Sequence, residues 1–215
     1  MSDSTLYIRQ LGLEEYLPVW QRMQAYTDTR DEHSKDEIWL VQHPPVFTLG
    51  RNGKPEHLLN LGDIPLVKVD RGGQVTYHGP GQIVAYLMLD LRRLGKGIRE
   101  VVSSIERAII NQLALHEIHA QARADAPGVY VDDAKIAALG LRVRHGKCYH
   151  GLSFNIDMDM EPFSRINPCG YQGMAVTQLS DLIAADIQID RTEKELIIQL
   201  ASQLDYKNID WITSD

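Results

Sequence analysis

Short apolar runs, separated by polar and glycine-rich stretches, recur along the chain and predict strands. The clearest is Ile83 to Leu89, an uninterrupted apolar run between Gln82 and Asp90. A run of this length bounded by polar residues is typical of a strand. We expect further strands over residues 5–9, 37–42, 64–69, 119–123, 128–131, 134–143 and 149–156, and residues 46–50 are expected to resume the strand at 37–42.

Apolar residues at helical spacing predict helices between these strands. Val101, Ile105, Ala108 and Ile109 would form one apolar face of a helix over residues 98–116. Residues 13–27 show the same spacing, and helices are also expected over 179–185 and 193–204. Because strands and helices mix without strict alternation, we expect an α+β fold with a mixed, mainly antiparallel sheet and packed helices. Length and the absence of repeats or linkers favour a single domain over residues 1–215.

A glycine-rich segment interrupts the strand pattern between residues 64–69 and Ile83. It runs from Arg71 to Gln82 and reads RGGQVTYHGPGQ. Glycine allows backbone N–H groups to approach a ligand closely and adopts positive φ readily. Arg71 and His78 add donors near the two ends of such a cradle. The alternative interpretation is a wide hairpin turn whose glycines serve only its geometry.

Composition and charge narrow the classes of protein. The chain is 44% hydrophobic and 24% charged, as in soluble globular proteins, and its formal net charge of −7 argues against nucleic acid as the main partner. The longest apolar run is too short to span a membrane, which takes about 20 residues. Because residues 1–5 do not resemble a signal peptide, we expect a cytoplasmic protein and no membrane partner.

Two cysteines differ in their surroundings. Cys169 lies between Pro168 and Gly170, which favours an exposed turn where a thiolate could act as a nucleophile. The alternative is that Cys169 is a small buried apolar residue. Cys148 lies beside a predicted strand, and we interpret it as structural. Two cysteines make neither a disulfide framework nor, without histidines at finger-like spacing, a zinc site, so we expect no metal.

Four basic side chains are candidates for a site around Cys169. Lys135 precedes an apolar run and is either solvated or turned into the site, where it could pair with Cys169. His78 and His150 are candidates for substrate contact, and a histidine base is the alternative to Lys135. Arg71 either binds an anionic group of a ligand or braces its own loop.

Four stretches occur in order and together resemble one enzyme family. They are Arg71 to Gln82; Lys135 to Arg142, which reads KIAALGLR; His150 to Asn155, which reads HGLSFN; and Arg165 to Gly170, which reads RINPCG. This set resembles the signature of the lipoyl(octanoyl) transferases, which move an octanoyl group from acyl carrier protein to lipoyl domains. The resemblance covers roughly Leu6 to Leu182.

The resemblance implies a biotin/lipoate protein ligase-like fold and a single catalytic domain. It implies that Cys169 is the nucleophile, that Lys135 is its proton partner, and that no cofactor is required. The donor would be octanoyl-acyl carrier protein, and the acceptors would be the lipoyl domains of 2-oxoacid dehydrogenases and the glycine cleavage H protein. The substrate-binding residues it implies are Arg71, Gly72, Gly73, Gln74, Val75, Thr76, Tyr77, His78, Ala138, Leu139, Gly140, His150, Gly151, Leu152 and Ser153.

Two other functions remain open at this stage. On the same fold, an ATP-dependent lipoate or biotin protein ligase would use the glycine-rich segment to hold an acyl-adenylate. A non-catalytic acyl-binding protein would keep the pocket and would not depend on Cys169. Formation of an adenylate from ATP and free acid would favour the ligase, and survival of function without Cys169 would favour the binding protein.

Overall fold

A computed structural model describes residues 4–184 and 187–212, except for the side chain of Cys169. Its main element is an eight-stranded sheet in the order β11-β1-β2-β6-β10-β9-β8-β7. The strands are β1 (Thr5–Leu13), β2 (Glu37–Gln42), β6 (Gln82–Asp90), β7 (Ala120–Ala122), β8 (Gly128–Val131), β9 (Ala134–Arg144), β10 (Lys147–Asn155) and β11 (Asn208–Ile212). A second, three-stranded sheet has the order β4-β3-β5, from Leu66–Lys68, Val46–Leu49 and Val75–His78.

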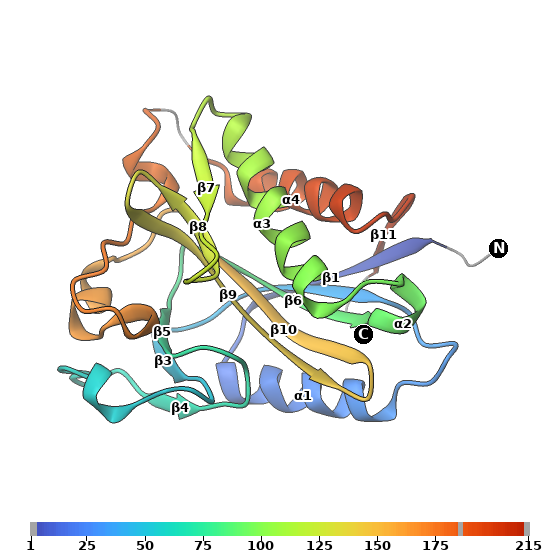
Figure 1. The fold of residues 1–215 in the computed structure, drawn as a ribbon, viewed down its shortest axis with the longest axis horizontal. Coiled ribbons are helices and arrows are strands. Elements are labelled where there is room, and N and C mark those ends of the chain that lie inside the picture. The colour runs from blue at the N-terminus through green and yellow to red at the C-terminus, as the bar shows by residue number, and fades with distance from the viewer. Residues whose placement is uncertain (1–3, 185–186, 213–215) are drawn as a thin grey trace.

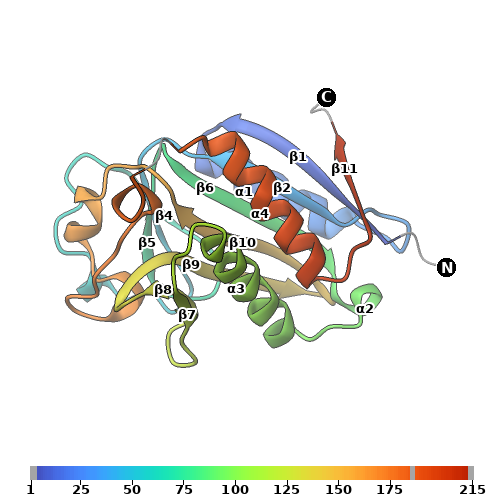
Figure 2. The ribbon, with the colours of Figure 1, turned by 90° about the horizontal axis from the view of Figure 1, so that it is seen from above.

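Helices cover both faces of the large sheet (Figure 1). The helices are α1 (Tyr16–Thr29), α2 (Leu91–Leu94), α3 (Ile98–Ala114) and α4 (Ile189–Gln203). Short 3₁₀ turns occur at Pro55–His57, Glu161–Arg165, Pro168–Gly170 and Leu179–Asp181. Helices α3 and α4 lie side by side on one face, whereas α1 and the small sheet lie on the other (Figures 1 and 2).

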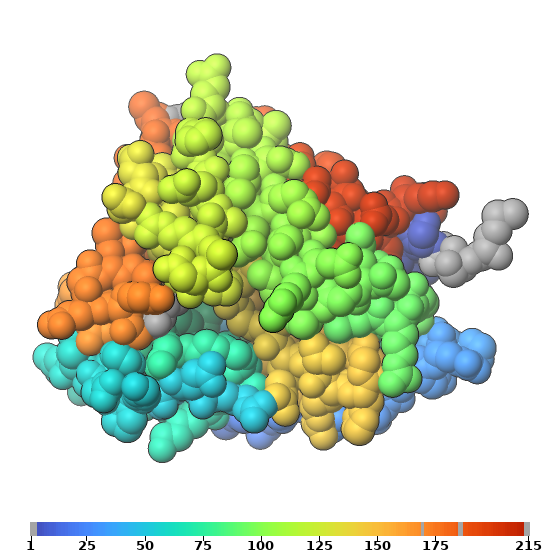
Figure 3. All heavy atoms as spheres, in the orientation of Figure 1, coloured from blue at the N-terminus to red at the C-terminus, as the bar shows by residue number. Residues whose placement is uncertain are grey.

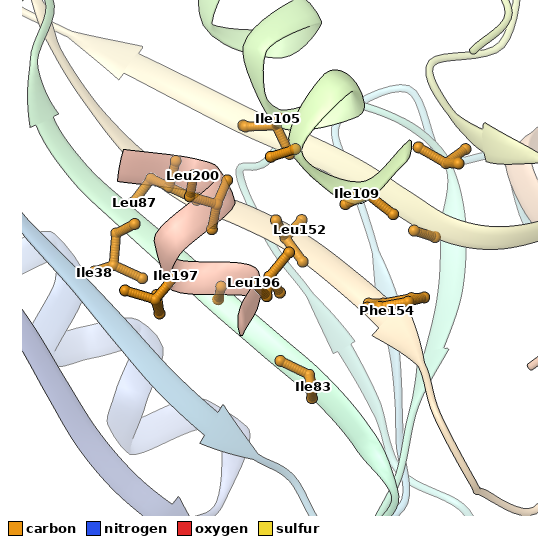
Figure 4. Close-up of a cluster of buried hydrophobic side chains, with 14 of the residues drawn as sticks. Ile38, Ile83, Leu87, Ile105, Ile109, Leu152, Phe154, Leu196, Ile197 and Leu200 are labelled. Atoms are coloured by element: carbon orange, nitrogen blue, oxygen red, sulfur yellow. The ribbon is translucent and has the colours of Figure 1, made fainter. Parts of the chain in front are cut away.

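The strand β6 is apolar from Ile83 to Leu89 because both of its faces are covered. Ile83, Ala85 and Leu87 pack against α3 and α4, and the alternating residues Val84 and Tyr86 pack in the cluster that contains α1. Successive side chains of a strand point to opposite faces, so a strand covered on both faces needs apolar residues at every position. Figure 4 shows the first of these clusters, where Ile83 and Leu87 of β6 lie among side chains of α4 (Leu196, Ile197 and Leu200) and α3 (Ile105 and Ile109).

The predicted α+β fold with mainly antiparallel pairing is confirmed. Antiparallel ladders join β2 to β6, β6 to β10, and β10 through β9 and β8 to β7. Parallel pairs are β1 with β2, β1 with β11, and β3 with β4. The strand β11 was not predicted, because its sequence NIDWI mixes polar and apolar residues at the exposed edge of the sheet.

Two other local predictions were wrong. Residues 46–50 do not resume β2; Val46–Leu49 form β3 of the small sheet and pair with β5, which lies inside the glycine-rich segment. The Pro44-Pro45 pair lacks two backbone donors, and this favours the turn away from the large sheet. Residues 179–185 form only a 3₁₀ turn over Leu179–Asp181, and Ala185 lies outside the described residues. In the part of the chain that the structure describes, no helix has the length and apolar character needed to cross a membrane.

Candidate active site

A pocket lies between the large sheet, the helix α1 and the glycine-rich segment. Its empty space is about 710 Å³, part of it open to solvent. In Figure 3 the surface is hollowed where the teal glycine-rich segment, the yellow-green β8–β9 region and the orange segment after β10 meet. The lining residues are Tyr16, Arg71, Gly73, Gln74, Val75, Thr76, His78, Val84, Tyr86, Lys135, Ala137, Ala138, Leu139, Gly140, His150, Gly151, Leu152, Ser153, Asn155, Phe163, Pro168 and Val176.

Small residues on β9 and β10 leave room for this pocket. Gly140 pairs with Gly151, and Ala138 pairs with Ser153, so neighbouring positions of the two strands carry little side-chain volume. A Cβ added at Gly140 would lie 3.0 Å from the carbonyl oxygen of Gly72. The glycine-rich segment therefore approaches β9 as closely as a backbone without a side chain permits.

Arg71 braces the glycine-rich segment from inside. Its Nη2 donates to the carbonyl oxygens of Thr48 at 2.7 Å and Gln74 at 2.8 Å, and its Nη1 donates to Gly72 O at 2.9 Å. The Gly72 N–H donates to Leu141 O on β9 at 3.1 Å. Two roles were considered for Arg71: binding an anionic group of a ligand, and bracing its own loop. These contacts show that Arg71 braces its loop.

Lys135 is buried at one side of the pocket. Its Nζ donates to Pro127 O at 3.3 Å and lies 5.1 Å from the centre of the Tyr130 ring. Its backbone N–H donates to Ala175 O, and its own carbonyl accepts from Thr177 N–H. The strand that carries Lys135 is thus bonded to the chain that follows the Pro168–Gly170 turn.

The backbone of Cys169 lies in that turn, but its side chain is outside the described structure. Gly170 has φ +80°, and a Cβ there would meet His57 Nε2 at 3.2 Å and Gln74 Cγ at 3.4 Å. Since Gln74 and Pro168 both line the pocket, the turn lies at the rim of the pocket. Cys148, by contrast, is buried in the hydrophobic cluster between the large sheet and helices α3 and α4, where its thiol donates to Leu87 O. Burial raises the pKa of this thiol to about 12.

Two of the predicted residues are buried histidines with defined partners. His78 Nδ1 donates to Gln82 Oε1 at 2.7 Å, because the amide nitrogen of Gln82 is already directed at Asn155 Oδ1. Burial lowers the pKa of His78 to about 3, so His78 is neutral at pH 7. His78 is therefore suited to shaping the pocket wall and not to carrying charge.

His150 has an unusual backbone for a strand residue, with φ +60°. Its Nε2 lies 2.9 Å from Asp70 Oδ1, and Asp70 also accepts from Trp20 and Tyr149. Burial lowers the pKa of His150 despite the Asp70 carboxylate beside it. For Asp70, burial opposes ionisation, but the bonds from His150, Tyr149 and Trp20 outweigh it and hold the pKa of its carboxyl well below the usual range.

Most residues expected at the site meet in this one pocket. Among the described residues, Gly72 and Tyr77 are the expected ones that do not line it; the Tyr77 ring packs instead with Phe47 and Phe163. Sequence reasoning missed Tyr16 and Tyr86. Tyr16 belongs to the apolar stripe of the predicted first helix, and Tyr86 belongs to the apolar run Ile83 to Leu89. A buried tyrosine hydroxyl needs a hydrogen-bond partner, and this requirement is the feature of the sequence that could have indicated both residues.

Comparisons with known proteins agree with this arrangement. Residues 15–201 match the family model of the lipoyl protein ligase A/B catalytic domain. The chain is 57% identical over 206 residues to an octanoyltransferase of Azotobacter vinelandii, covering 96% of this chain and 94% of that protein. It is 61% identical over 199 residues to an octanoyltransferase of Stutzerimonas stutzeri, covering 93% and 90%.

A solved structure shares the fold at low identity. It is that of a bi-partite lipoate protein ligase and its E2 lipoyl domain from Thermoplasma acidophilum, with a TM-score of 0.73, 17% identity, and coverage of 97% of this chain and 87% of that one. At this identity the likeness concerns the fold alone. The family match and the close relatives go further: the chain belongs to the lipoyl protein ligase A/B catalytic domain family and, within it, to the octanoyltransferases, which are acyltransferases.

Proposed function

We propose that this protein transfers an octanoyl group from octanoyl-acyl carrier protein to the ε-amine of a lysine in lipoyl domains, through a thioester on Cys169. The observation that carries the proposal is that Lys135, the glycine-rich segment and the Pro168–Gly170 turn border a single pocket. Lipoyl domains of 2-oxoacid dehydrogenases and the glycine cleavage H protein are the proposed acceptors. The cytoplasmic location and the single catalytic domain over residues 1–215 remain predictions.

The first half of the reaction forms the acyl-enzyme. The Cys169 sulfur attacks the thioester carbonyl of the donor, a C–S bond to Cys169 forms, and the C–S bond to the carrier breaks. Lys135 takes the thiol proton and returns it to the departing carrier sulfur. A thiol needs such a partner because only its thiolate is an effective nucleophile, and an ordinary thiol is mostly protonated at neutral pH.

The second half transfers the acyl group to the acceptor. The lysine amine attacks the same carbonyl, a C–N bond forms, and the C–S bond to Cys169 breaks. The amine must first be free of its extra proton, since its ordinary pKa is about 10.4. Lys135 accepts the proton that the attacking nitrogen loses and returns it to the Cys169 sulfur. A thioester is converted to an amide, which is downhill, so the reaction requires no ATP.

The proposed substrate-binding residues follow the chemistry of an acyl chain. Ala138, Leu139, Gly140, Gly151 and Leu152 supply apolar or minimal surface. Gly73 is exposed and Gln74 and Thr76 are half-buried, so these three residues lie where the polar thioester end would enter, whereas Ser153 is a buried polar residue of the wall. His78 and His150 complete the walls.

Intact-protein mass spectrometry after mixing with octanoyl-acyl carrier protein tests the proposal. Wild type and Cys148→Ser should each gain the mass of one octanoyl group, and peptide mapping should place it on the peptide containing Cys169. Cys169→Ser should gain none and should not modify a lipoyl domain. Full turnover by Cys169→Ser, or an adenylate formed from ATP and free octanoate, would overturn the mechanism.

A further inference from the structure

Two tyrosines close the buried end of the pocket. Tyr16 from α1 is 2% exposed and Tyr86 from β6 is 4% exposed. Their rings meet edge to face, with centroids 6.5 Å apart. The Tyr16 ring also stacks on His78, with centroids 5.6 Å apart. Three aromatic rings, those of Tyr16, Tyr86 and His78, therefore lie together at this wall.

His43 fixes Tyr86 in this position. His43 Nδ1 lies 2.6 Å from the carbonyl oxygen of Glu14, which can only accept, so Nδ1 carries the proton. Burial lowers the pKa of His43 to about 4, so its ring is neutral at pH 7 and Nε2 accepts. Tyr86 therefore donates its hydroxyl proton to that Nε2, over 2.7 Å.

The wall lies opposite the end where the chemistry is proposed. Gly73 is exposed and Gln74 is half-buried, and they mark the open lip beside the Pro168–Gly170 turn. Tyr86 pairs with Gly151, which pairs in turn with Gly140. From β9 to β6 is thus two strand spacings, roughly 10 Å. That distance is comparable to the length of an extended eight-carbon acyl chain.

Behind the wall there is packed core. Val19 and Met23 of α1 are fully buried in the cluster that also contains Tyr16 and Tyr86, and Met88 continues that cluster on β6. Within the described structure these three side chains do not line the pocket. An acyl chain that reached the tyrosines would therefore meet a filled interior.

From this geometry we propose that Tyr16 and Tyr86 form the end stop that sets the acyl-chain length, with His43 as a positioning residue behind them. The proposal rests on the proposed acyl transfer and adds its specificity. A longer chain must displace a hydrogen-bonded aromatic wall, whereas a shorter chain leaves space beneath it. One methylene in an apolar pocket changes discrimination by about 10- to 200-fold.

The test compares acyl chains of six, eight, ten and twelve carbons in two ways. Transfer rates are measured from the corresponding acyl carriers, and dissociation constants are measured by calorimetry for the free fatty acids, which requires no turnover. Tyr16→Ala should raise the ten- to eight-carbon ratio of transfer rates, and lower the ten- to eight-carbon ratio of dissociation constants, by about 10-fold or more. Val84→Leu, which narrows the pocket beside Tyr86, should shift preference toward six carbons. Leu17→Ala, on the exposed side of α1, is the matched control and should keep the wild-type ratios.

The outcomes separate this inference from the function on which it rests. Wild type that transfers no octanoyl group contradicts the proposed function, and the fatty-acid constants still test the end stop. Circular dichroism shows whether Tyr16→Ala is folded; if it is not, Val84→Leu tests the end stop from the opposite direction. Chain-length ratios that stay at wild-type values in the folded variants overturn the end-stop proposal.

Discussion

The guanidinium of Arg71 donates to the backbone carbonyl of Thr48 over 2.7 Å and to the Thr48 hydroxyl over 2.9 Å. This joins the glycine-rich segment to the central strand of the small sheet. The same guanidinium group donates to Gly72 O and Gln74 O. The Arg71 side chain thus holds the start of the glycine-rich segment both to β3 and to the turn over residues 72–74.

Arg71→Lys should loosen this segment. An ammonium group cannot reproduce the planar set of donors, so carbonyl oxygens around Thr48 and Gln74 would lose partners. We expect the free energy of unfolding to fall by about 2 kcal/mol, measured by urea denaturation, because each unsatisfied buried polar group costs about 1–3 kcal/mol. Arg191→Lys, in an exposed pair with Glu195, should change it little. Equal losses in the two variants would contradict the bracing role.

Gly128→Ala should act on the site through Lys135. A Cβ at Gly128 would lie 2.7 Å from the carbonyl oxygen of Ala137 on the paired strand β9 and 3.0 Å from Lys135 Cε, and the glycine has φ +148°. The substitution should therefore shift β9 together with the Lys135 side chain. We expect acyl-enzyme formation to slow by about 10-fold or more, since positioned acid–base groups contribute about 10²- to 10⁴-fold.

The comparison variants for Gly128→Ala are Lys135→Ala and Lys54→Ala. Lys135→Ala should show the full loss of about 10²- to 10⁴-fold in single-turnover assays. Lys54→Ala, which removes an exposed lysine, should keep the wild-type rate. A wild-type rate in Lys135→Ala would remove that lysine from the mechanism.

Gly151→Ala should disrupt the sheet itself. The added Cβ would lie 2.0 Å from the carbonyl oxygen of Ala85 on the paired strand β6, where no flexible side chain can yield. We expect a loss of stability of about 3 kcal/mol or more, seen as a lowered melting temperature or insoluble protein. Gly97→Ala, where the nearest atom is the flexible carboxylate of Glu100 at 3.3 Å, should be much milder. If Gly151→Ala has the melting temperature of the wild type, the predicted steric conflict with Ala85 is wrong.

Acid should destabilise the protein through His43 and His78. Burial lowers their pKa values to about 4 and about 3, whereas an unfolded histidine titrates near 6.5. Between these values the unfolded chain binds protons that the folded chain does not, so the free energy of unfolding falls as pH drops from about 6.5 toward 4. At pH 5 each histidine should contribute a loss on the order of 2 kcal/mol relative to pH 7.

Urea denaturation at pH 7 and pH 5 measures this effect. His43→Gln should reduce the difference between the two pH values, because one of the two groups no longer titrates. His33→Gln, whose side chain is 86% exposed, should leave the difference unchanged. The same pH dependence in wild type and His43→Gln would show that His43 is not its source.

Much of the fold was readable from the chain, because local patterns determine local structure. The run Ile83 to Leu89 became β6, and the apolar stripe from Val101 to Leu113 became α3. The ordered motifs around Arg71, Lys135 and Cys169 identified the family, and most of their residues line one pocket. These predictions succeeded because strand and helix periods, and short motifs with chemical requirements, are properties of adjacent residues.

Tertiary structure alone decided which distant residues share a wall. Tyr16 and Tyr86 lie 70 positions apart and meet only because α1 crosses the face of β6. The assignment of residues 46–49 to the small sheet depended on pairing with β5, and the bracing role of Arg71 depended on its reach to Thr48. Sequence periodicity specifies which faces are apolar but not which elements cover them, because that choice is made by packing between segments far apart in the chain.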